Sequence, residues 1–417
     1  MFVDFGLMSI CIDIKRAILI YIQNIYVFRV SMTNKELHTI LGLGIIFALR
    51  MLGVFMVLPV LTIHVTSLAG VNGHLIGIAI GIYGLMQIIF QLPFGLMSDR
   101  IGRKPVIVGG LILFALGSEI AAVTNNIWGL IVGRALQGSG AISSSLIALL
   151  LESVREQHHI KAMASVGISF GITFAISMIC GPIITDMFGL HGLFHTIAIL
   201  AILAIVFTYV VITPISFYPT KNNENLFVTV NKIKKIFAHS QLIKLNFSIF
   251  CVHTILILNF IALPKAIINL GFPLGAHWKI YTIIMVMSAI TVCVCLMCSE
   301  GKNYTRKILI ICMNILFISE LIMLTNMCHY RMFLCGMQLF FIAFNLIEAI
   351  LPTLINKESP KKYKGTTVSI YSIGQFLGVG FGGILGGFLL EIKGIWLVFF
   401  FALIVSTLCI IMSHMLR

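Results

Sequence analysis

The sequence predicts an all-α integral membrane protein with twelve transmembrane helices in two six-helix halves. Of its 417 residues, 59% are hydrophobic and only 10% are charged, and the mean hydropathy is +1.07. Soluble domains carry about 25% charged residues, so this composition excludes a soluble protein. A helix needs about 20 mostly apolar residues to cross a hydrocarbon core of about 30 Å. Twelve such helices would occupy most of the chain and leave no room for a sizeable soluble domain.

Apolar runs, separated by polar residues or by Gly and Pro, give the twelve expected spans. The first six are 38–63, 75–97, 105–123, 127–151, 161–186 and 193–213, and the last six are 243–268, 278–298, 307–326, 331–354, 365–390 and 394–415. The longest polar stretch lies between these two groups. We therefore divide the chain into an N-terminal extension (1–37), an N-terminal half (38–213), a linker (214–242) and a C-terminal half (243–417).

The distribution of Lys and Arg predicts the orientation of these spans. If the N-terminus is cytoplasmic, 22 of the 28 basic residues fall in inside segments. Three fall outside (Lys279, Arg331 and Lys393), and three lie within helices (Arg50, Arg134 and Lys265). Cytoplasmic loops of membrane proteins collect Lys and Arg. We therefore expect both termini, the extension and the linker to be cytoplasmic, with an even number of spans.

Two segments outside the spans leave alternatives open. In the linker, Val228–His239 places lysines at helical spacing beside apolar residues, which fits an amphipathic helix on the inner leaflet or a solvated linker. Near the N-terminus, Ala17–Val30 is too short and polar to span the membrane, and no cleavage site of small residues marks a signal peptide. Either Met32 is the true start of the protein, or residues 1–31 form a peripheral extension.

A loop between the second and third spans carries the most specific motif. It reads GLMSDRIGRKP, and its specified residues are Gly95, Asp99, Arg100, Gly102, Arg103 and Lys104. Gly95 allows close helix packing, and Gly102 permits a turn at positive φ. The loop resembles the G-x-x-x-D-R-x-G-R-[RK] motif of the major facilitator superfamily. A simple excess of positive charge on the inside explains the cations but not Asp99 or the two glycines.

This resemblance implies a function for the loop. In the family, the aspartate lies near the N-terminus of helix eleven, whose partial positive charge favours an anion. Here that helix begins near Gly365–Ser369. The basic residues complete a cluster that holds the two halves together on the cytoplasmic side, and we call it the cytoplasmic latch. A weak copy, Ser299–Lys302 followed by Arg306 and Lys307, stands between spans eight and nine, as expected for a repeated half.

The fourth and fifth spans carry two further motifs. Arg134 and Gln137 lie in the segment RALQG, residues 134–138. This segment resembles the helix-four motif that the family associates with proton transfer. Gly181 and Pro182 resemble the helix-five motif of the antiporters, and we expect a helix break there. Thr185 and Asp186 replace the glycine pair that follows in the family, which weakens the antiporter assignment.

The resemblance covers roughly residues 35–415 and points to the drug:proton antiporter group of this superfamily, in the bacterial inner (cell) membrane. It is also carried by Arg50–Pro59 and Gly77–Gln91. Some members of this group continue into a soluble C-terminal domain. Here the sequence stops at Arg417, directly after the last span, so we expect no such domain.

Ionisable groups inside the membrane are rare and mark functional sites. We assign proton coupling to Arg134, Gln137, Glu320 and Glu348, since a carboxyl group desolvated in a helical bundle can bind a proton at neutral pH. We assign the substrate cavity to Arg50, Gln87, Gln91 and His253. For Arg50, a structural ion pair fits equally well. For His253, a plain hydrogen-bonding role is the common alternative.

The leading functional hypothesis is proton-coupled efflux of small molecules by alternating access, without a cofactor or metal. The expected partners are a small-molecule substrate, protons and the lipid bilayer, with no nucleic acid, and the expected state is a monomer. The glycine-rich stretch Gly374–Gly387 in span eleven fits either a sliding seam with helix two or tight static packing. A uniporter or an uptake symporter for a polar metabolite is the alternative. A membrane enzyme or sensor is the third, and His158–His159 is its only hint. No P-loop motif appears, so ATP is not the direct energy source.

Overall fold

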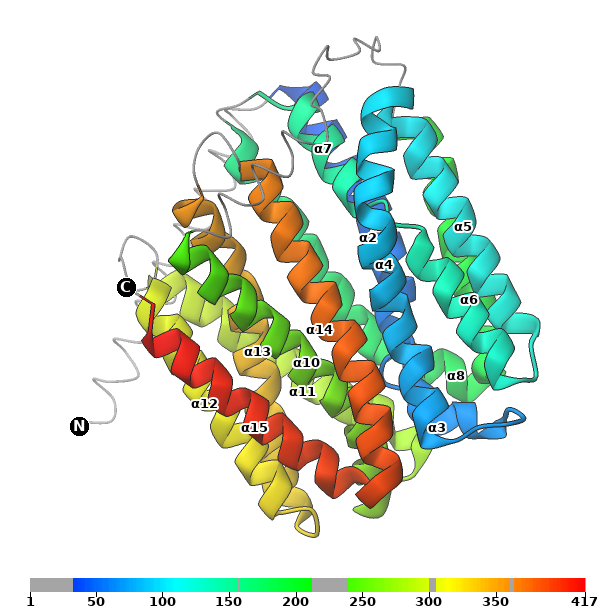
Figure 1. Cartoon of the computed structure of the whole chain (residues 1–417), viewed down its shortest axis with the longest axis vertical. Coiled ribbons are helices and arrows are strands. Elements are labelled where there is room, and N and C mark those ends of the chain that lie inside the picture. Colours follow the sequence, from blue (N-terminus) through cyan, green and yellow to red (C-terminus); the bar gives the residue numbers. More distant parts are fainter. Residues whose placement is uncertain (1–32, 156–157, 212–238, 300–304, 360–363, 417) are drawn as a thin grey trace, which may run out of the picture.

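The computed structural model describes residues 33–155, 158–211, 239–299, 305–359 and 364–416 (Figure 1). In these ranges the chain is almost wholly helical, and a single bridge links Ala69 to Asn126. The expectations for Met32 and residues 1–31, for most of the linker, and for the first part of the motif copy near residue 300 lie outside the described residues.

The helices follow one another in two sets. The N-terminal half contains α2 (Asn34–Met56), α3 (Leu61–His64), η1 (Val65–Ser67), α4 (Gly73–Ile101), α5 (Arg103–Val123), α6 (Ile127–Ser139), α7 (Ser143–Ser153) and α8 (His159–Val211). The C-terminal half contains α10 (Ser240–Asn269), η3 (Leu274–Ala276), α11 (His277–Ser299), α12 (Thr305–Thr325), α13 (Tyr330–Glu358), α14 (Lys364–Lys393) and α15 (Ile395–His414).

The described residues contain twelve helical segments that can cross a membrane. Eleven helical segments of the described chain are long and apolar enough to cross a membrane, and one of them, Ser165–Val210, has 46 residues. At about 1.5 Å per residue that segment is about 70 Å long, more than twice the hydrocarbon core. Inside it, Gly189 has the non-helical dihedrals φ 69° and ψ −175°, so α8 is two spans joined at Gly189. The predicted all-α fold with twelve helices is confirmed.

Two helix breaks differ from expectation. The expected break at Gly181–Pro182 is wrong at the level of the backbone, because α8 stays helical there and departs from helical dihedrals only at Gly189. Gly181 instead permits close packing: a Cβ on it would lie 2.4 Å from the carbonyl oxygen of Met56, where α2 ends. The fourth span, expected to be continuous, is divided into α6 and α7 around Gly140, whose Cβ would meet the Gly110 carbonyl at 2.3 Å.

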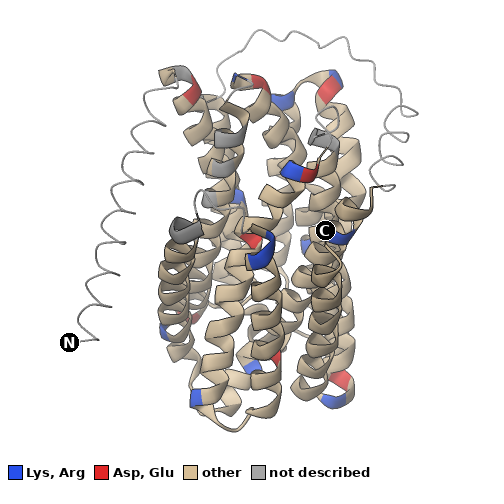
Figure 2. Cartoon of the chain, turned by 90° about the vertical axis from the view of Figure 1, so that its left-hand side faces the viewer, with Lys and Arg blue, Asp and Glu red and all other residues tan. Residues whose placement is uncertain are grey.

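The bundle has two ends, which we name by residues. The Asp99 end holds Asp99, the ends of α4 and α7 and the start of α14, and the Glu391 end holds α3, the start of α4 and the end of α14. Figure 1 shows α4 and α14 converging toward the Glu391 end and diverging toward the Asp99 end. Figure 2 shows long uncharged stretches of helix between the charged ends, as a membrane crossing requires.

Candidate functional site: the seam between the halves and its buried polar clusters

The two halves meet most closely where α4 crosses α14 near the Glu391 end. A Cβ on Gly77 would lie 2.4 Å from the carbonyl oxygen of Gly383, and one on Gly81 would lie 2.6 Å from that of Gly380. Glycine is needed here because only a residue without a side chain lets two helix backbones approach this closely. The Glu391 carboxylate accepts a hydrogen bond from the backbone N–H of His74 at 2.9 Å and fixes the end of this seam.

Other contacts close the same end. The Thr62 hydroxyl at the start of α3 donates to the carbonyl of Phe260 in α10 at 3.2 Å. The end of the first α8 span meets η3, where Asp186 lies beside Gly275. These contacts join the N-terminal half to the C-terminal half. The Glu391 end is therefore closed in this structure.

At the Asp99 end, α4 packs differently. The glycine contacts with α14 involve residues 73–84 of α4, whereas Gly95 has the Ser144 hydroxyl of α7, in its own half, as its neighbour. On both sides of Gly95 a surface pocket of about 450 Å³ is lined by Leu92, Pro93, Leu96, Met97 and Arg100, all from α4, so this pocket does not lie between the halves. In Figure 1 the ribbons of α4 and α14 diverge toward the Asp99 end, and we take the halves to be farther apart there than at the Glu391 end.

The motif residues form a charged cluster within the N-terminal half. Gly102 turns the chain from α4 into α5 with φ 100°, as its position in the motif predicts. Arg103 forms an ion pair with Asp99, binds Glu152 of α7 at 2.6 Å and donates to the Ser98 hydroxyl at 2.5 Å. The C-terminal half repeats this arrangement, because Arg306 of α12 pairs with Glu358 at the end of α13.

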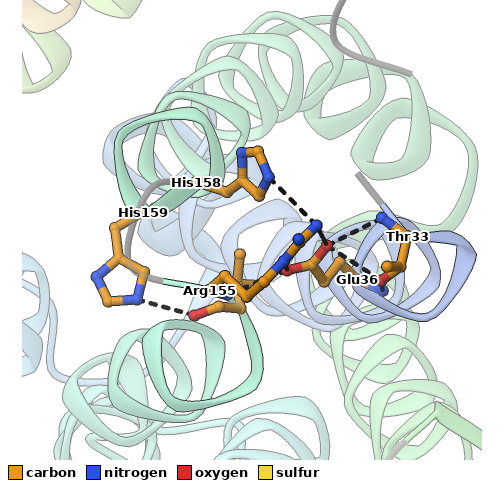
Figure 3. A network of polar contacts seen from close by, with 6 residues as sticks. Thr33, Glu36, Arg155, His158 and His159 are labelled. Atoms are coloured by element: carbon orange, nitrogen blue, oxygen red, sulfur yellow. Dashed lines mark hydrogen bonds and ion pairs between the residues drawn. The ribbon is translucent and has the colours of Figure 1, made fainter. Parts of the chain in front are cut away.

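A second network at this end ties the start of α2 to the end of α7 (Figure 3). Thr33 and Glu36 form a capping box that starts α2, and the Glu36 carboxylate binds Arg155 at 2.9 Å. The hydrogen bonds that Arg155 donates to the Glu36 carboxylate raise the pKa of Arg155 above its usual value. His158 lies 3.4 Å from Arg155, and His159 contacts the carbonyl of Val154. The histidine pair therefore belongs to a structural network between helix ends.

Arg50 is completely buried in the N-terminal half, in contact with α4 and the α6–α7 break. Its guanidinium donates to the Ser143 hydroxyl at 2.7 Å, to Gln87 Oε1 at 2.9 Å and to the carbonyl of Gly140 at 2.9 Å. Gly140 exposes this carbonyl because the helix is interrupted there. No ion pair of Arg50 occurs among the described residues, so the alternative of a structural ion pair is not what this conformation shows.

Arg134 lies in a separate buried cluster. It donates to Gln137 Oε1 at 2.8 Å, and its guanidinium carbon lies 4.8 Å from the centre of the Tyr83 ring. Gln137 in turn donates to the Ser118 hydroxyl at 2.8 Å. The Tyr83 ring also contacts Phe376 of α14, with ring centres 6.3 Å apart. Arg134 is thus one residue away from the seam between the halves.

The C-terminal half holds two buried carboxyl groups in different surroundings. Glu348 of α13 lies 3.5 Å from His253 Nε2 of α10 and accepts a long hydrogen bond, 3.4 Å, from Gln375 of α14. Glu320 of α12 accepts a hydrogen bond of 2.7 Å from Asn259 of α10. These two clusters share a helix, but no contact between them is present among the described residues.

An aromatic cluster connects the halves beside the first of these groups. The ring of Phe174, in α8, lies 5.5 Å from that of Phe344 and 6.3 Å from that of Phe260. Phe344 in turn lies 5.9 Å from the ring of His253. A chain of ring contacts therefore leads from the N-terminal half to the His253–Glu348 pair.

Comparison with known proteins assigns the family. The family model for the Major Facilitator Superfamily matches residues 43–300 and 301–417. The chain belongs to the major facilitator superfamily. It is 50% identical over 359 residues to the inner membrane transport protein YajR of Escherichia coli (strain K12), which covers 86% of this chain and 79% of YajR. Family membership makes the protein a multi-pass inner-membrane transporter and removes the enzyme hypothesis.

Two further matches are shorter or more distant. The tetracycline resistance protein, class B, of Escherichia coli is 34% identical over 173 residues, which cover 40% of this chain and 41% of that protein. A solved bacterial homologue of the human lysosomal transporter Spinster, inward-facing and occupied, has a TM-score of 0.71 at 10% identity. That match covers 92% of this chain and 97% of the other and shows the shared fold.

For this major facilitator transporter, the structure groups the predicted site residues in an unexpected way. Arg50 and Gln87 lie together, but His253 is in the other half, beside Glu348. Gln91 is buried on α4 and only 4% exposed. Lys104 is placed over the ring of Tyr209, with its Nζ 4.7 Å from the ring centre.

Sequence reasoning missed the anionic partners at the Asp99 end. Glu152 and Glu358 occupy corresponding positions at the ends of the fourth and tenth spans. Comparing the two halves for acidic residues at matching helix ends would have found this pair. Glu36 was also missed, although the sequence carries the signal of a capping box there. Thr33 is followed three residues later by a glutamate.

Proposed function

We propose that this transporter exports small, largely apolar molecules across the bacterial inner membrane in exchange for protons, by alternating access. The observation that carries the proposal is the buried contact among His253, Glu348 and Gln375, on three different helices. The side chains of His253 and Glu348 are only 6% and 12% exposed. A carboxyl group with so little water contact can bind and release a proton only when its surroundings change.

The link from this site to the conformational change runs through α14. Gln375 of α14 donates to Glu348. The glycines of α14 that pack against α4, from Gly380 to Gly387, follow Gln375 within about four turns of the same helix. A proton on Glu348 changes the hydrogen bond that Gln375 can make. Because a ligand shifts a conformational equilibrium only through different interactions in the two states, this is the physical requirement for coupling.

The buried arginines give the N-terminal half a fixed positive charge. Arg50 and Arg134 are 0% and 1% exposed, and neither has a carboxylate partner among the described residues. Arg134 stacks on Tyr83, which contacts Phe376 on the opposite side of the seam. We propose that this charge disfavours a cationic substrate in the seam.

The proposed orientation places the Asp99 end in the cytoplasm, because 22 of the 28 basic residues would then be on the inside. The open end in this structure would accordingly face the cytoplasm, where an exporter binds its substrate. A proton moving down a potential of 100 mV supplies about 2.3 kcal/mol. The partial match to a tetracycline resistance protein makes tetracycline the first compound to test.

The proposal is tested with purified protein in proteoliposomes. A thermal-shift screen in detergent, starting with tetracycline, selects a transported compound. Accumulation of that compound should require a proton gradient, and its movement should be accompanied by a pH change inside the vesicle. Glu348→Gln should abolish both. Glu119→Gln is the matched control, since Glu119 is about half exposed and pairs with His195 near the surface.

Accumulation that survives collapse of the gradient would favour the uniporter alternative. Proton movement that persists in Glu348→Gln would remove this residue from the coupling site.

A further inference from the structure

Glu320 and Asn259 form an isolated pair inside the C-terminal half. Both side chains are 0% exposed, and Asn259 Nδ2 donates to Glu320 Oε1 at 2.7 Å. The second oxygen of each group, Glu320 Oε2 and Asn259 Oδ1, is also buried and has no hydrogen-bond partner. Two unpaired acceptors at one buried site require an explanation, because buried polar atoms are almost always hydrogen-bonded.

Nothing in the surroundings compensates a negative charge on Glu320. Among the described residues no Lys, Arg or His pairs with it, and the adjacent hydroxyl of Ser319 donates to the carbonyl of Leu316. An ionised carboxylate without a counter-charge is strongly disfavoured in such a site, and the group binds a proton instead. A protonated carboxyl group gains one O–H donor.

We propose that Glu320 is permanently protonated and forms a cyclic pair with Asn259. In this pair Asn259 Nδ2–H donates to Glu320 Oε1, and Glu320 Oε2–H donates to Asn259 Oδ1. One proton satisfies both unpaired oxygens and leaves no net charge. The pair joins α10 to α12 within one half and remains closed throughout the transport cycle.

This assignment separates the two buried acids by function. Glu348 contacts His253 and the seam helix α14, so its surroundings change when the seam opens. The hydrogen-bond partner of Glu320 is on α10, in its own half, and no hydrogen bond or ion pair of Glu320 with the N-terminal half occurs among the described residues. Glu320 is thus a positioning residue and not the proton carrier. The inference holds whether or not transport is proton-coupled, because it rests on the pair alone.

The test uses Glu320→Gln in the full-length protein in detergent. A glutamine reproduces the cyclic pair, because its Nε2–H donates to Asn259 Oδ1 and its Oε1 accepts from Asn259 Nδ2. The thermal midpoint should stay within about 2 °C of the parent protein at every pH between about 6 and 9. Glu320→Leu leaves the amide of Asn259 without partners. It should lower the thermal midpoint by several times the limit of about 2 °C expected for Glu320→Gln.

Infrared spectroscopy then reads the proton directly. In a Glu348→Gln background, the C=O stretch of a protonated carboxyl group should be present throughout this pH range and should disappear with Glu320→Gln. A band that titrates away below about pH 9 overturns the proposal. So does a Glu320→Gln protein that fails to fold, or whose midpoint differs from the parent in a pH-dependent way.

Discussion

At the residue scale, Arg103 organises the charged contacts of the Asp99 end. It pairs with Asp99, four residues earlier at the end of α4, and with Glu152 on α7. In this structure these contacts lie within one half, so the contact of Asp99 with the start of α14 that the motif predicts is a proposal for the conformation in which this end closes. The side chain of Asp99 is 53% exposed and can reach a new partner when the halves approach.

We predict that Asp99→Asn leaves folding intact and slows transport. An exposed ion pair contributes about 0.2–1 kcal/mol, so the thermal midpoint in detergent should fall by less than about 3 °C. Loss of a latch contact of about 1 kcal/mol should lower the transport rate roughly fivefold. Glu358→Gln, which removes the acidic partner of Arg306 in the other half, controls for a general loss of surface charge. Wild-type transport by Asp99→Asn would reduce the loop to an orientation signal.

Residue types were predicted better than residue partners. Arg50, Arg134 and Glu348 were recognised as candidates because a charge inside a membrane is costly. Their neighbours depend on which helices are adjacent, and a single sequence does not specify this. Arg50, for example, binds a carbonyl that is free only because the fourth span is interrupted at Gly140, and that span was expected to be continuous.

At the element scale, α4 and α14 control the closure of the Glu391 end. Glycines of α4 pack against residues of α14 along the seam, from Gly73 beside Glu391 to Gly84 beside Gly380. The glycine pattern of span eleven predicted close packing with helix two. It did not indicate at which end α4 and α14 would be in contact, because small residues permit close approach of the helices in every relative orientation of the two halves.

We predict that Gly383→Ala prevents this closure. Its Cβ would lie 2.5 Å from the backbone nitrogen of Gly81, and rigid backbone cannot move aside as a side chain would. Overpacking of this kind costs about 1–3 kcal/mol, which shifts the closed-to-open ratio roughly 5- to 150-fold. Gly109→Ala is the control, since no atom lies within 4 Å of its Cβ position. Equal transport by the two variants would show that the seam does not have to close.

We also predict that acid opens the Glu391 end. Burial of His64, in α3 outside the membrane spans, lowers its pKa below 6.5, and Asp186 of α8 offsets only part of this effect. His277 of α11 faces it from the other half. When the end opens and His64 is hydrated, its pKa returns toward the usual value. The open state therefore binds the proton more readily, and the closed state loses stability as the pH falls below 6.5.

This pH effect is tested by measuring a distance across the Glu391 end at about pH 7.5 and at about pH 5.5. These two conditions bracket the usual histidine pKa of about 6.5. The open fraction should rise at the lower pH in the parent protein and should not respond in His64→Asn. A response of the same size in both proteins would assign the effect to another group.

At the scale of the whole molecule, composition and hydropathy were sufficient for the fold. Twelve spans in two halves follow from lengths and polarity, because only helices of the right length satisfy their backbone groups in lipid. The conformation does not follow from these patterns. It depends on small free-energy differences between two packings of the same helices, and the sequence is compatible with both.

In the proposed cycle the two halves alternate, so that opening of one end accompanies closure of the other. This alternation is tested most directly with two spin-label pairs, each in a background without the ten native cysteines. One pair, Ile101 and Met415, reports the Asp99 end, and the other, Trp128 and Trp396, reports the Glu391 end. All four side chains are 46–59% exposed on the surface of the bundle, where labels fit without disturbing the seam.

In lipid nanodiscs at neutral pH, we predict a long Ile101–Met415 distance and a short Trp128–Trp396 distance. Gly383→Ala, or acid, should lengthen the second distance and shorten the first in the same molecules. Distances that change independently at the two ends, or that lengthen together, would contradict alternating access by this seam.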